Sequence, residues 1–287
     1  MNFVFALLPA VLLSGCIMTD FGPSDRYRTS FHYNYDLQPD ARVNLEGFNG
    51  PVEILGWDQN KVEISGEKYA STQQGLDSIR IDIHNDPGSL EVRAVKPSAH
   101  FGNLGVSYTV HVPRGVALER ITSANGRIHV RDVNGEVHLR TSNSPIRMEN
   151  LKGAVDAQTS NGPIEASDLG AGAKLRTSNG PIRVESVEGE IAAHTSNGPV
   201  NITFHNAPKS GIRAEASNGS ITLRLPADTI ARVDANTSNG SVSSDFNVTR
   251  NSGDSREALH HLSGVIGGGG PLIDLTTTNG GISLLRR

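Results

Sequence analysis

Polar side chains recur at a fixed interval along the middle of this chain, and a straight row of such groups could bind a polymer. One set, at positions i, i+18, i+36 and i+54, comprises Arg140, Gln158, Arg176 and His194. If these positions share one column of the folded protein, Arg140, Arg176 and His194 form a shallow basic stripe that would attract an anionic polymer. The same pattern also suits ordinary solvated side chains, and both interpretations stay open.

Cleavage of a polysaccharide would require two or more carboxylates, or an Arg or Lys base beside calcium, in one groove. The outward columns of this sequence instead mix acids and bases, as in the column His129, Arg147, Glu165 and Arg183. Such alternation most simply stabilises neighbouring strands. Between Ile121 and Asp245 the single aromatic residue is Phe204, so the repeats lack a stacking platform for sugar rings. We therefore predict no catalytic residues, and a carbohydrate-active enzyme or polysaccharide-binding protein is kept as the alternative.

Metal and nucleic-acid chemistry find little support in the sequence. The ten His residues are scattered, and the adjacent pair His260 and His261 cannot by itself close a metal site. The net charge of -4 gives no basic footprint for nucleic acid. We expect no metal, no cofactor and no nucleic-acid partner.

The one cysteine of the chain closes the sequence Leu13-Ser14-Gly15-Cys16. The apolar residues before it are too few for the ~20 helical residues that span a bilayer, and they end on small residues, as in a signal peptide. The tetrapeptide matches the bacterial lipobox, and this resemblance implies removal of residues 1–15 and lipidation of Cys16. By the sorting rule known for such lipoproteins, Ile17 after the cysteine favours the outer membrane, with the protein facing the periplasm or the surface.

The elements that must position the polar columns follow from a repeated motif, Thr-Ser-Asn-Gly-Pro-Ile. Its Asn returns four times at i+18 and then twice at i+21, and an eighth copy, Asn279, follows at i+40. The seven regularly spaced positions are Asn125, Asn143, Asn161, Asn179, Asn197, Asn218 and Asn239. A fixed period of this length indicates one supersecondary unit repeated along an axis.

Aligning the repeats shows which positions are apolar. The third position is occupied by Ile128, Ile146, Ile164 and Ile182. Positions 3 and 5, and again 12 and 14, are apolar with polar residues between them, which is the period of a β-strand. Each repeat is therefore predicted to contain two short strands, separated by the Asn-Gly corner, where both residues tolerate positive φ, and by a second glycine-containing turn.

One such repeat cannot bury its apolar edge alone, whereas repeats stacked at ~4.8 Å form a continuous core. We predict an all-β fold, a parallel β-solenoid of two-strand coils with the i+18 to i+21 period of the Asn motif, right-handed by the rule for parallel crossovers. In this arrangement the Asn side chains would stack and could hydrogen-bond along the axis. The simplest role of these residues is structural, in the turn, and a ligand-binding row is the alternative.

The predicted organisation has four parts. Residues 1–15 form the signal peptide and residues 16–30 the lipidated cysteine and a tether. Residues 31–120 form an irregular β cap with the first coils, which we expect to hide the edge of the solenoid. Residues 121–287 form the regular coils, with an insertion near 246–270.

Several motifs together resemble the putative-adhesin β-strand-repeat family of bacterial envelope proteins, a family of unknown function. They are the lipobox, Gly56-Trp57-Asp58, Val112-Pro113-Arg114-Gly115-Val116, the Thr-Ser-Asn-Gly coils and the closing Gly-rich segment before Asn279. The resemblance covers roughly 36–285 and implies no catalytic residues. We expect a non-enzymatic outer-membrane lipoprotein whose solenoid is a scaffold or adhesin-like surface, with a membrane contact through the lipid and an envelope protein or polysaccharide as partner.

Overall fold

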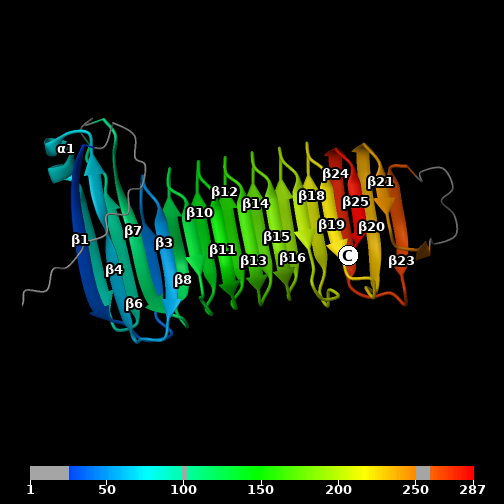
Figure 1. Cartoon of the computed structure of the whole chain (residues 1–287), viewed down its shortest axis with the longest axis horizontal. Helices are drawn as coiled ribbons and strands as arrows, with labels where there is room; N and C mark the ends of the chain where they lie inside the picture. The colour runs from blue at the N-terminus through cyan, green and yellow to red at the C-terminus, as the bar shows by residue number, and fades with distance from the viewer. Residues whose placement is uncertain (1–25, 99–101, 250–258) are drawn as a thin grey trace, which may run out of the picture.

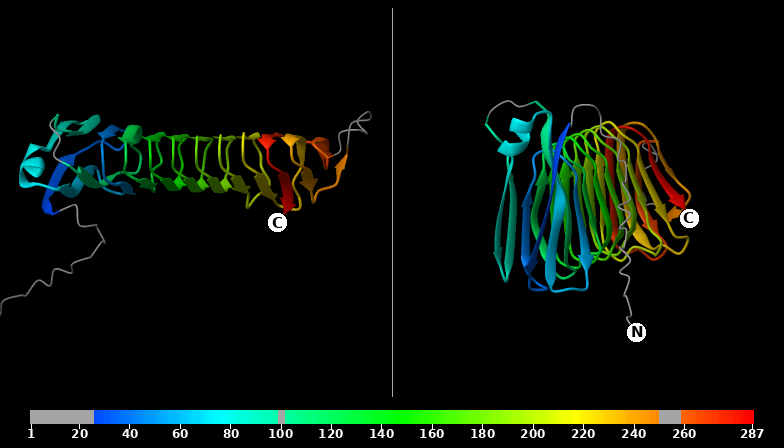
Figure 2. Two further views of the ribbon diagram at one scale, coloured as in Figure 1. Left: turned by 90° about the horizontal axis from the view of Figure 1, so that it is seen from above. Right: turned by 60° about the vertical axis from the view of Figure 1, so that its left-hand side comes forward.

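The computed structural model describes residues 26–98, 102–249 and 259–287 of the chain. Cys16, the predicted signal peptide and most of the tether lie outside the described residues. The described strands form two sheets, one of 12 and one of 13 strands, stacked face to face in an elongated body (Figure 1). Seen from above, the body consists of two thin layers along its whole length (Figure 2). The all-β, two-sheet solenoid is therefore confirmed.

Each regular coil contributes one strand to each sheet, because its two apolar segments are separated by turns. The 13-stranded sheet takes β8 (Ala117–Ser123), β10 (Val137–Thr141), β12 (Val155–Thr159), β14 (Ala173–Thr177), β16 (Ile191–Thr195) and β18 (Ile212–Ala216). The 12-stranded sheet takes β9 (Ile128–Arg131), β11 (Ile146–Leu151), β13 (Ile164–Leu169), β15 (Ile182–Val187), β17 (Val200–Thr203) and β19 (Ile221–Leu225). Successive strands are parallel and pair repeat upon repeat, Ile146 with Ile164 and Ile164 with Ile182.

The core lies between the sheets and consists of these apolar columns. Ile128, Ile146, Ile164 and Ile182 are all fully buried. A column of buried threonines closes the core at the Asn-Gly corner. The Thr177 hydroxyl donates to the Gly162 carbonyl of the neighbouring coil at 3.0 Å, and Thr195 repeats this contact with Gly180 at 3.0 Å. A buried hydroxyl is thus satisfied by the next coil, as buried polar groups must be.

The N-terminal region continues both sheets with longer strands. The first coil, β2 (Arg42–Glu46) and β3 (Val52–Trp57), lies between the β8–β9 coil and a coil formed by β6 (Ser89–Val95) and β7 (Leu104–Pro113). Beyond these, β4 (Lys61–Ala70) and β1 (Tyr27–Asp36) add antiparallel strands to one sheet, and β5 (Arg80–Asp86) adds one to the other. The described part of the chain has one helix, α1 (Gln73–Ser78), which begins at the cap residue Thr72. This helix has six residues, and no helix among the described residues is long and apolar enough to cross a membrane.

The C-terminal end departs from chain order. After β19 the chain forms β20 (Ala231–Asn239), β21 (Val242–Ser244), β22 (Val248–Thr249) and β23 (His261–Ile266), then returns as β24 (Leu272–Asn279) and β25 (Ile282–Arg286). The returning pair lies between the β18–β19 coil and the β20–β21 coil, as the red strands in Figure 1 show. The predicted insertion near 246–270 therefore includes the antiparallel strands β22 and β23 at the end of one sheet.

The edge strands at the two ends of the solenoid differ in length. The N-terminal sheets end in β1, of 10 residues, and β5, of 7 residues, and no described strand pairs with their outer edges. The C-terminal sheets end in β21 and β22, of 3 and 2 residues. Within the described residues the cap strands extend both sheets and leave the outer edges of β1 and β5 unpaired, so this part of the chain does not hide the edge as we expected.

Candidate functional site

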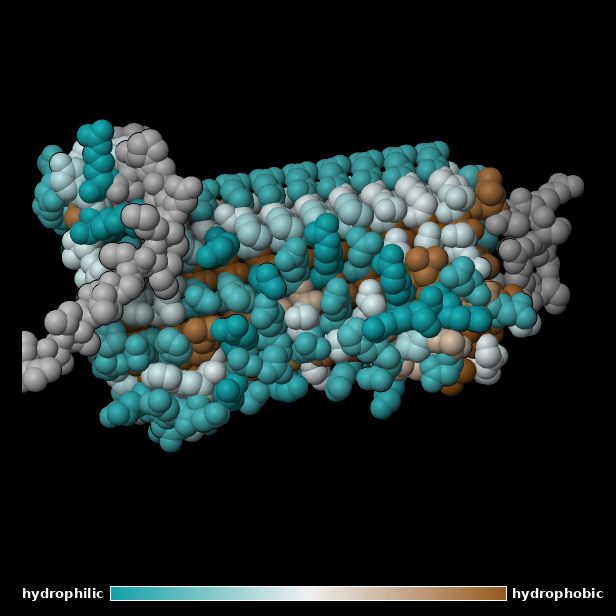
Figure 3. All heavy atoms as spheres, in the orientation of Figure 1, coloured by the Kyte–Doolittle hydropathy of each residue, from teal (hydrophilic) through white to brown (hydrophobic). Residues whose placement is uncertain are grey.

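The asparagines of the corner motif form one continuous hydrogen-bonded row along the solenoid. Each Nδ2 donates to the Oδ1 of the Asn in the neighbouring coil, at 2.7 to 2.9 Å. In spatial order the row is Asn49, Asn125, Asn143, Asn161, Asn179, Asn197, Asn218, Asn279 and Asn239. At one end, Asn49 Nδ2 donates to the Leu104 carbonyl at 2.9 Å. The row forms the regular hydrophilic line along the upper edge of the molecule in Figure 3.

The glycine that follows most asparagines of the row has a different role from the one that we expected. In the regular coils these glycines do not have positive φ. A Cβ on Gly180 would instead lie 2.1 Å from the Gly162 carbonyl oxygen, and one on Gly198 would lie 2.3 Å from the Gly180 oxygen. At these corners the coils approach so closely that a Cβ would clash with the next carbonyl, which favours glycine. The one exception in the regular coils is Ser144, which follows Asn143.

Positive φ occurs in another column, which we did not expect from the sequence. Its members lie near the end of the strand that a coil contributes to the 12-stranded sheet, or directly after it. Their φ angles lie between 51° and 62°, and they are Asp132, Asn150, Asp168 and Ser186. Asp and Asn tolerate this conformation better than other non-glycine residues, so their recurrence at i+18 was the signal that could have identified it.

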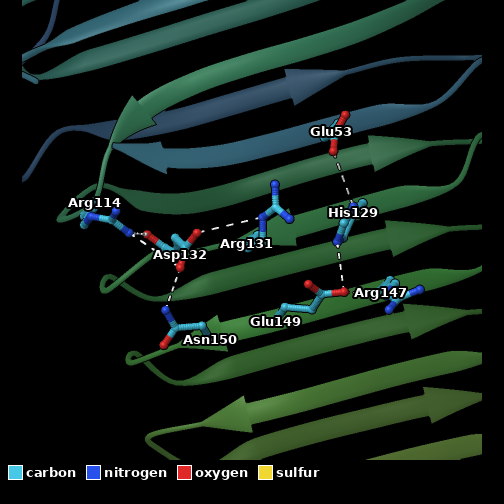
Figure 4. Close-up of polar contacts among 8 residues, drawn as sticks. All are labelled: Glu53, Arg114, His129, Arg131, Asp132, Arg147, Glu149 and Asn150. Atoms are coloured by element: carbon cyan, nitrogen blue, oxygen red, sulfur yellow. Dashed lines mark hydrogen bonds and ion pairs between the residues drawn. The ribbon is translucent and has the colours of Figure 1, made fainter. Parts of the chain in front are cut away.

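A network of charged side chains lies on the 12-stranded sheet, where the cap joins the coils (Figure 4). His129 stands between two carboxylates, with its Nδ1 3.5 Å from Glu53 Oε1 and its Nε2 3.4 Å from Glu149 Oε1. Arg147 Nε donates to the same Glu149 oxygen at 2.6 Å. These contacts join three successive strands, β3, β9 and β11.

A second part of the network surrounds Asp132. Asn150 Nδ2 donates to Asp132 Oδ1 at 2.5 Å, and an Arg114 guanidinium nitrogen lies 3.6 Å from the same oxygen. Arg114 also donates from Nε to Asp58 at 2.8 Å, which raises the pKa of Arg114. The network thus ties the loop after β7 to two coils (Figure 4).

The protonation of Glu149 indicates what this network can do. Partial burial alone would raise the pKa of Glu149, but the hydrogen bond from Arg147 and the charges of Arg147, His129 and Arg131 lower it overall. A general acid for glycoside cleavage needs a raised pKa. Glu149 therefore stays ionised at neutral pH and acts as an ion-pair partner between coils.

A groove of about 480 Å³, which we did not expect from the sequence, lies beside this network. Its lining includes Phe31, Glu53, Glu67, Tyr108 and His129. Glu67 faces Arg28 at 3.2 Å, and Glu53 faces His129, so both carboxylates have cationic neighbours. The Phe31 and Tyr108 rings meet edge to face, with centroids 5.7 Å apart. The Tyr108 hydroxyl is buried without a hydrogen-bond partner among the described residues, and burial raises its pKa.

The predicted basic stripe lies on the opposite, 13-stranded sheet. Arg140, Gln158, Arg176 and His194 pair in register from strand to strand. His194 Nδ1 lies 3.1 Å from Glu215, whose pKa is lowered overall despite partial burial, by hydrogen bonds from Arg213 and His194. Because His194 already pairs with Glu215, it does not contribute a free cation to the stripe.

The remaining cations of the stripe lack acidic partners. Arg140, Arg176 and Lys174, which also faces outward on β14, have no carboxylate within 4.0 Å among the described residues. The flanking arginines of the same sheet are paired: Arg93 and Arg120 each lie 3.2 Å from Glu46, and Arg42 lies 3.7 Å from Glu119. A hollow of about 560 Å³ over Ala192 adjoins Arg176. We define Arg140, Lys174 and Arg176 as the basic stripe from here on.

No cluster of three or more His, Cys, Asp or Glu residues that could hold a metal occurs within residues 26–98, 102–249 and 259–287. The fold and these surfaces define a parallel β-solenoid with an exposed Asn row along one edge and charged outer faces. The chain belongs to the Toastrack DUF4097 family, whose model matches residues 52–285.

No curated protein sequence matches the chain. Similar solved structures include a putative cell adhesion protein from Clostridium sporogenes, with 14% identity over 90% of this chain and 100% of that chain, and a TM-score of 0.29. Another is a putative adhesin from Bacteroides fragilis, with 12% identity over 90% of this chain and 97% of that chain, and a TM-score of 0.45.

Proposed function

We propose that this protein is a non-enzymatic, adhesin-like lipoprotein of the bacterial cell envelope, whose solenoid presents the basic stripe to an anionic polysaccharide. The observation that carries the proposal is the row of exposed cations on the 13-stranded sheet. Arg42, Arg93 and Arg120 on the same sheet each lie within 4.0 Å of a carboxylate. Arg140, Lys174 and Arg176 have no carboxylate that close among the described residues, and the nearest acidic neighbour in register is Asp156 beside Lys174.

The geometry of the stripe suits a repeating ligand. Arg140 and Arg176 lie on strands that are two positions apart, a separation of about 9.6 Å at the ordinary strand spacing. Each exposed cation contributes little alone, so useful affinity requires a polymer that meets several at once. The hollow beside Arg176 is also lined by Glu190 and Glu215, so it gives space for an uncharged part of a sugar ring.

The membrane part of the proposal depends on Cys16. The lipobox supports acylation of this residue, and residues 17–26 would then connect the lipid to β1. Expression in a bacterium with labelled palmitate should label the wild-type protein, and Cys16→Ser should give an unlabelled, unprocessed or unanchored protein. A Cys16→Ser protein that is processed normally and still sediments with membranes would exclude this anchor.

Binding to polygalacturonate, measured by microscale thermophoresis, tests the stripe. The variant Arg140→Gln/Lys174→Gln/Arg176→Gln should bind at least ~10-fold more weakly, a loss of about 1.4 kcal/mol. The matched control is Arg42→Gln/Arg93→Gln/Arg120→Gln, which removes the same charge from the same sheet where the arginines are already paired. Equal weakening by both triple variants would show a non-specific charge effect and would overturn the proposal, as would an absence of binding by the wild type.

The groove beside His129 favours a second candidate, a carbohydrate-active enzyme. Two carboxylates and an edge-to-face aromatic pair line it, which is the kind of surface that such an enzyme needs. If the groove is catalytic, the protein releases reducing ends from a polysaccharide, and Glu53→Gln abolishes the release. Binding without release supports the first proposal.

A further inference from the structure

The N-terminal end of the solenoid has two long strands whose outer edges pair with no described strand. These are β1 in the 12-stranded sheet and β5 in the 13-stranded sheet. An exposed edge presents a row of free N–H and C=O groups that another strand can pair with, and soluble proteins usually protect such edges. At the C-terminal end the outermost described strands are shorter, with 3 and 2 residues, and very short edge strands are one way to protect an edge.

The inner faces of β1 and β5 carry apolar side chains that are only partly buried. They are Phe31, Tyr33 and Tyr35 on β1 and Ile81 and Ile83 on β5. Helix α1 packs against β1 and β4 and buries Leu76. The partly exposed side chains show that the core is incomplete at this end.

The charges of β1 are arranged for antiparallel pairing with a second copy of itself. If the pairing is centred on His32, Arg28 of each copy lies opposite Asp36 of the other, on the outer face. Arg28 also pairs with Glu67 of its own chain at 3.2 Å, so it would bridge the two carboxylates. On the inner face, Phe31 lies opposite Tyr33. Opposite charges and aromatic pairs are the cross-strand neighbours that stabilise a sheet.

The charges of β5 also suit antiparallel pairing with a second copy of the same strand. An antiparallel pairing centred on Ile83 places Arg80 of each copy opposite Asp86 of the other. It also places Asp82 opposite His84, again on the outer face, while Ile83 meets its own counterpart on the inner face.

The two centres lie at matching heights across the body. Through the strand registers, Ile83 is aligned with Leu139, and Tyr33, the neighbour of His32, is aligned with Met148. Leu139 and Met148 are each the second buried position from the Asn143 corner. One twofold axis normal to both sheets therefore passes close to both centres.

We propose that two copies of this protein join end to end through β1 and β5, so that both sheets continue from one copy into the other. The contact is isologous, with the same edges on both sides, so it closes as a dimer. The short strands at the far ends prevent further growth into a fibre. The dimer completes the core and doubles the length of the outer faces.

Cysteine cross-linking tests the register. In the full chain carrying Cys16→Ser, an introduced cysteine is the only thiol. His32→Cys should form a covalent dimer on mild oxidation, because residues at the centre face their own copies with Cβ atoms about 5 Å apart. Ser30→Cys and Asn34→Cys are the matched controls, since each would lie roughly 13 Å from its own copy, and they should stay monomeric under denaturing conditions. Equal cross-linking of all three, or none by His32→Cys, would overturn the proposal.

A charge exchange tests β5 independently. Arg80→Asp and Asp86→Arg each place like charges together twice per dimer, so each should raise the dissociation constant about tenfold at low salt, measured by sedimentation velocity. The double variant Arg80→Asp/Asp86→Arg restores opposite charges across the interface and should recover the wild-type constant. A wild-type protein that sediments as a monomer at micromolar concentration, or a double variant as weak as the singles, would contradict this pairing.

Discussion

Each buried side chain of the regular coils packs above and below side chains of the same kind. Ile182 is fully buried and pairs with Ile164 on one side and Val200 on the other. Truncation therefore leaves a cavity bounded by two coils that are held in place by their own ladders, and the surroundings cannot easily collapse into it. The next residue, Arg183, points outward and lies 3.6 Å from Glu165, with both side chains well exposed.

Ile182→Ala should therefore lower the free energy of unfolding by about 2–5 kcal/mol, the range for deletion of buried aliphatic atoms. Arg183→Ala should lower it by less than ~0.5 kcal/mol, because an exposed ion pair contributes little. Chemical denaturation of both variants measures the difference. Equal effects would contradict the inside and outside assignment of this strand.

The network around Glu149 predicts a pH dependence. The pKa of Glu149 is lowered in the folded protein from an ordinary value of 4.5. The ionised carboxylate therefore stabilises the fold above about pH 4.5, and this contribution is lost as the pH falls through the lower, folded-state pKa. The loss of stability on acidification should be smaller in Glu149→Gln than in the wild type, as measured by thermal unfolding from pH 6 downward. Identical slopes would show that the network does not contribute.

At the scale of the coil, the sequence predicted the strands and their faces because apolar residues alternate at fixed positions in every copy. Side-chain period, corner and register are all repeated, so each copy supports the same interpretation. The sequence could not show why glycine recurs at the corner. Close approach to the next coil and a positive φ both favour glycine, and only the structure distinguishes them. The groove beside His129 was also missed, since it joins β1, β4 and β9, which are distant in the sequence.

The two-strand coil predicts different outcomes for two internal deletions. Removal of 162–179 joins Asn161 to Gly180, so the corner, the Asn row and every buried column continue, and the protein loses one coil and one interface. Removal of 171–179 deletes β14 but keeps β13, so the chain reaches the next corner on the wrong sheet. The first variant should give a native-like β spectrum by circular dichroism and resist limited proteolysis, and the second should unfold from this point. The opposite result for either variant would show that the repeat unit is wrongly defined.

The order of the coils in space is a property of the whole molecule, and the sequence did not predict it. Asn239 and Asn279 carry the same corner motif, and both can follow Asn218. In the structure Asn279 takes the inner place, with its Nδ2 donating to Asn218 at 2.8 Å, and Asn239 stacks on Asn279 at 2.8 Å. Local pattern cannot distinguish the two orders, because each coil presents the same columns to its neighbours.

This equivalence predicts what happens when residues 271–287 are deleted. The deletion removes β24 and β25 and leaves an empty position between β19 and β21. The inward residues of β20, Val233 and Ala235, pair with Ile273 and Leu275 and occupy the same columns. In the intact protein, residues 226–230 connect β19 to β20 past the intervening β24–β25 coil, which is an axial distance of about 9.6 Å. After the deletion the same residues would need to span about 4.8 Å along the axis. We therefore expect β20 and β21 to move inward by one position and pair with β18 and β19, so that the truncated protein folds with one coil fewer.

A pair of cysteines distinguishes this rearrangement from simple unfolding of the end. Asn218→Cys/Asn239→Cys, made with Cys16→Ser, should not form a disulfide within one full-length chain, because Asn279 separates the two positions. In the chain that lacks 271–287 the same cysteines would lie on adjacent strands, close enough to cross-link on mild oxidation. A cross-link in the truncated chain alone, together with protease resistance of residues 231–239, is the expected result. Rapid proteolysis after Leu225 without a cross-link would show that the coils are not interchangeable and that β24 and β25 are required to hold the C-terminal end.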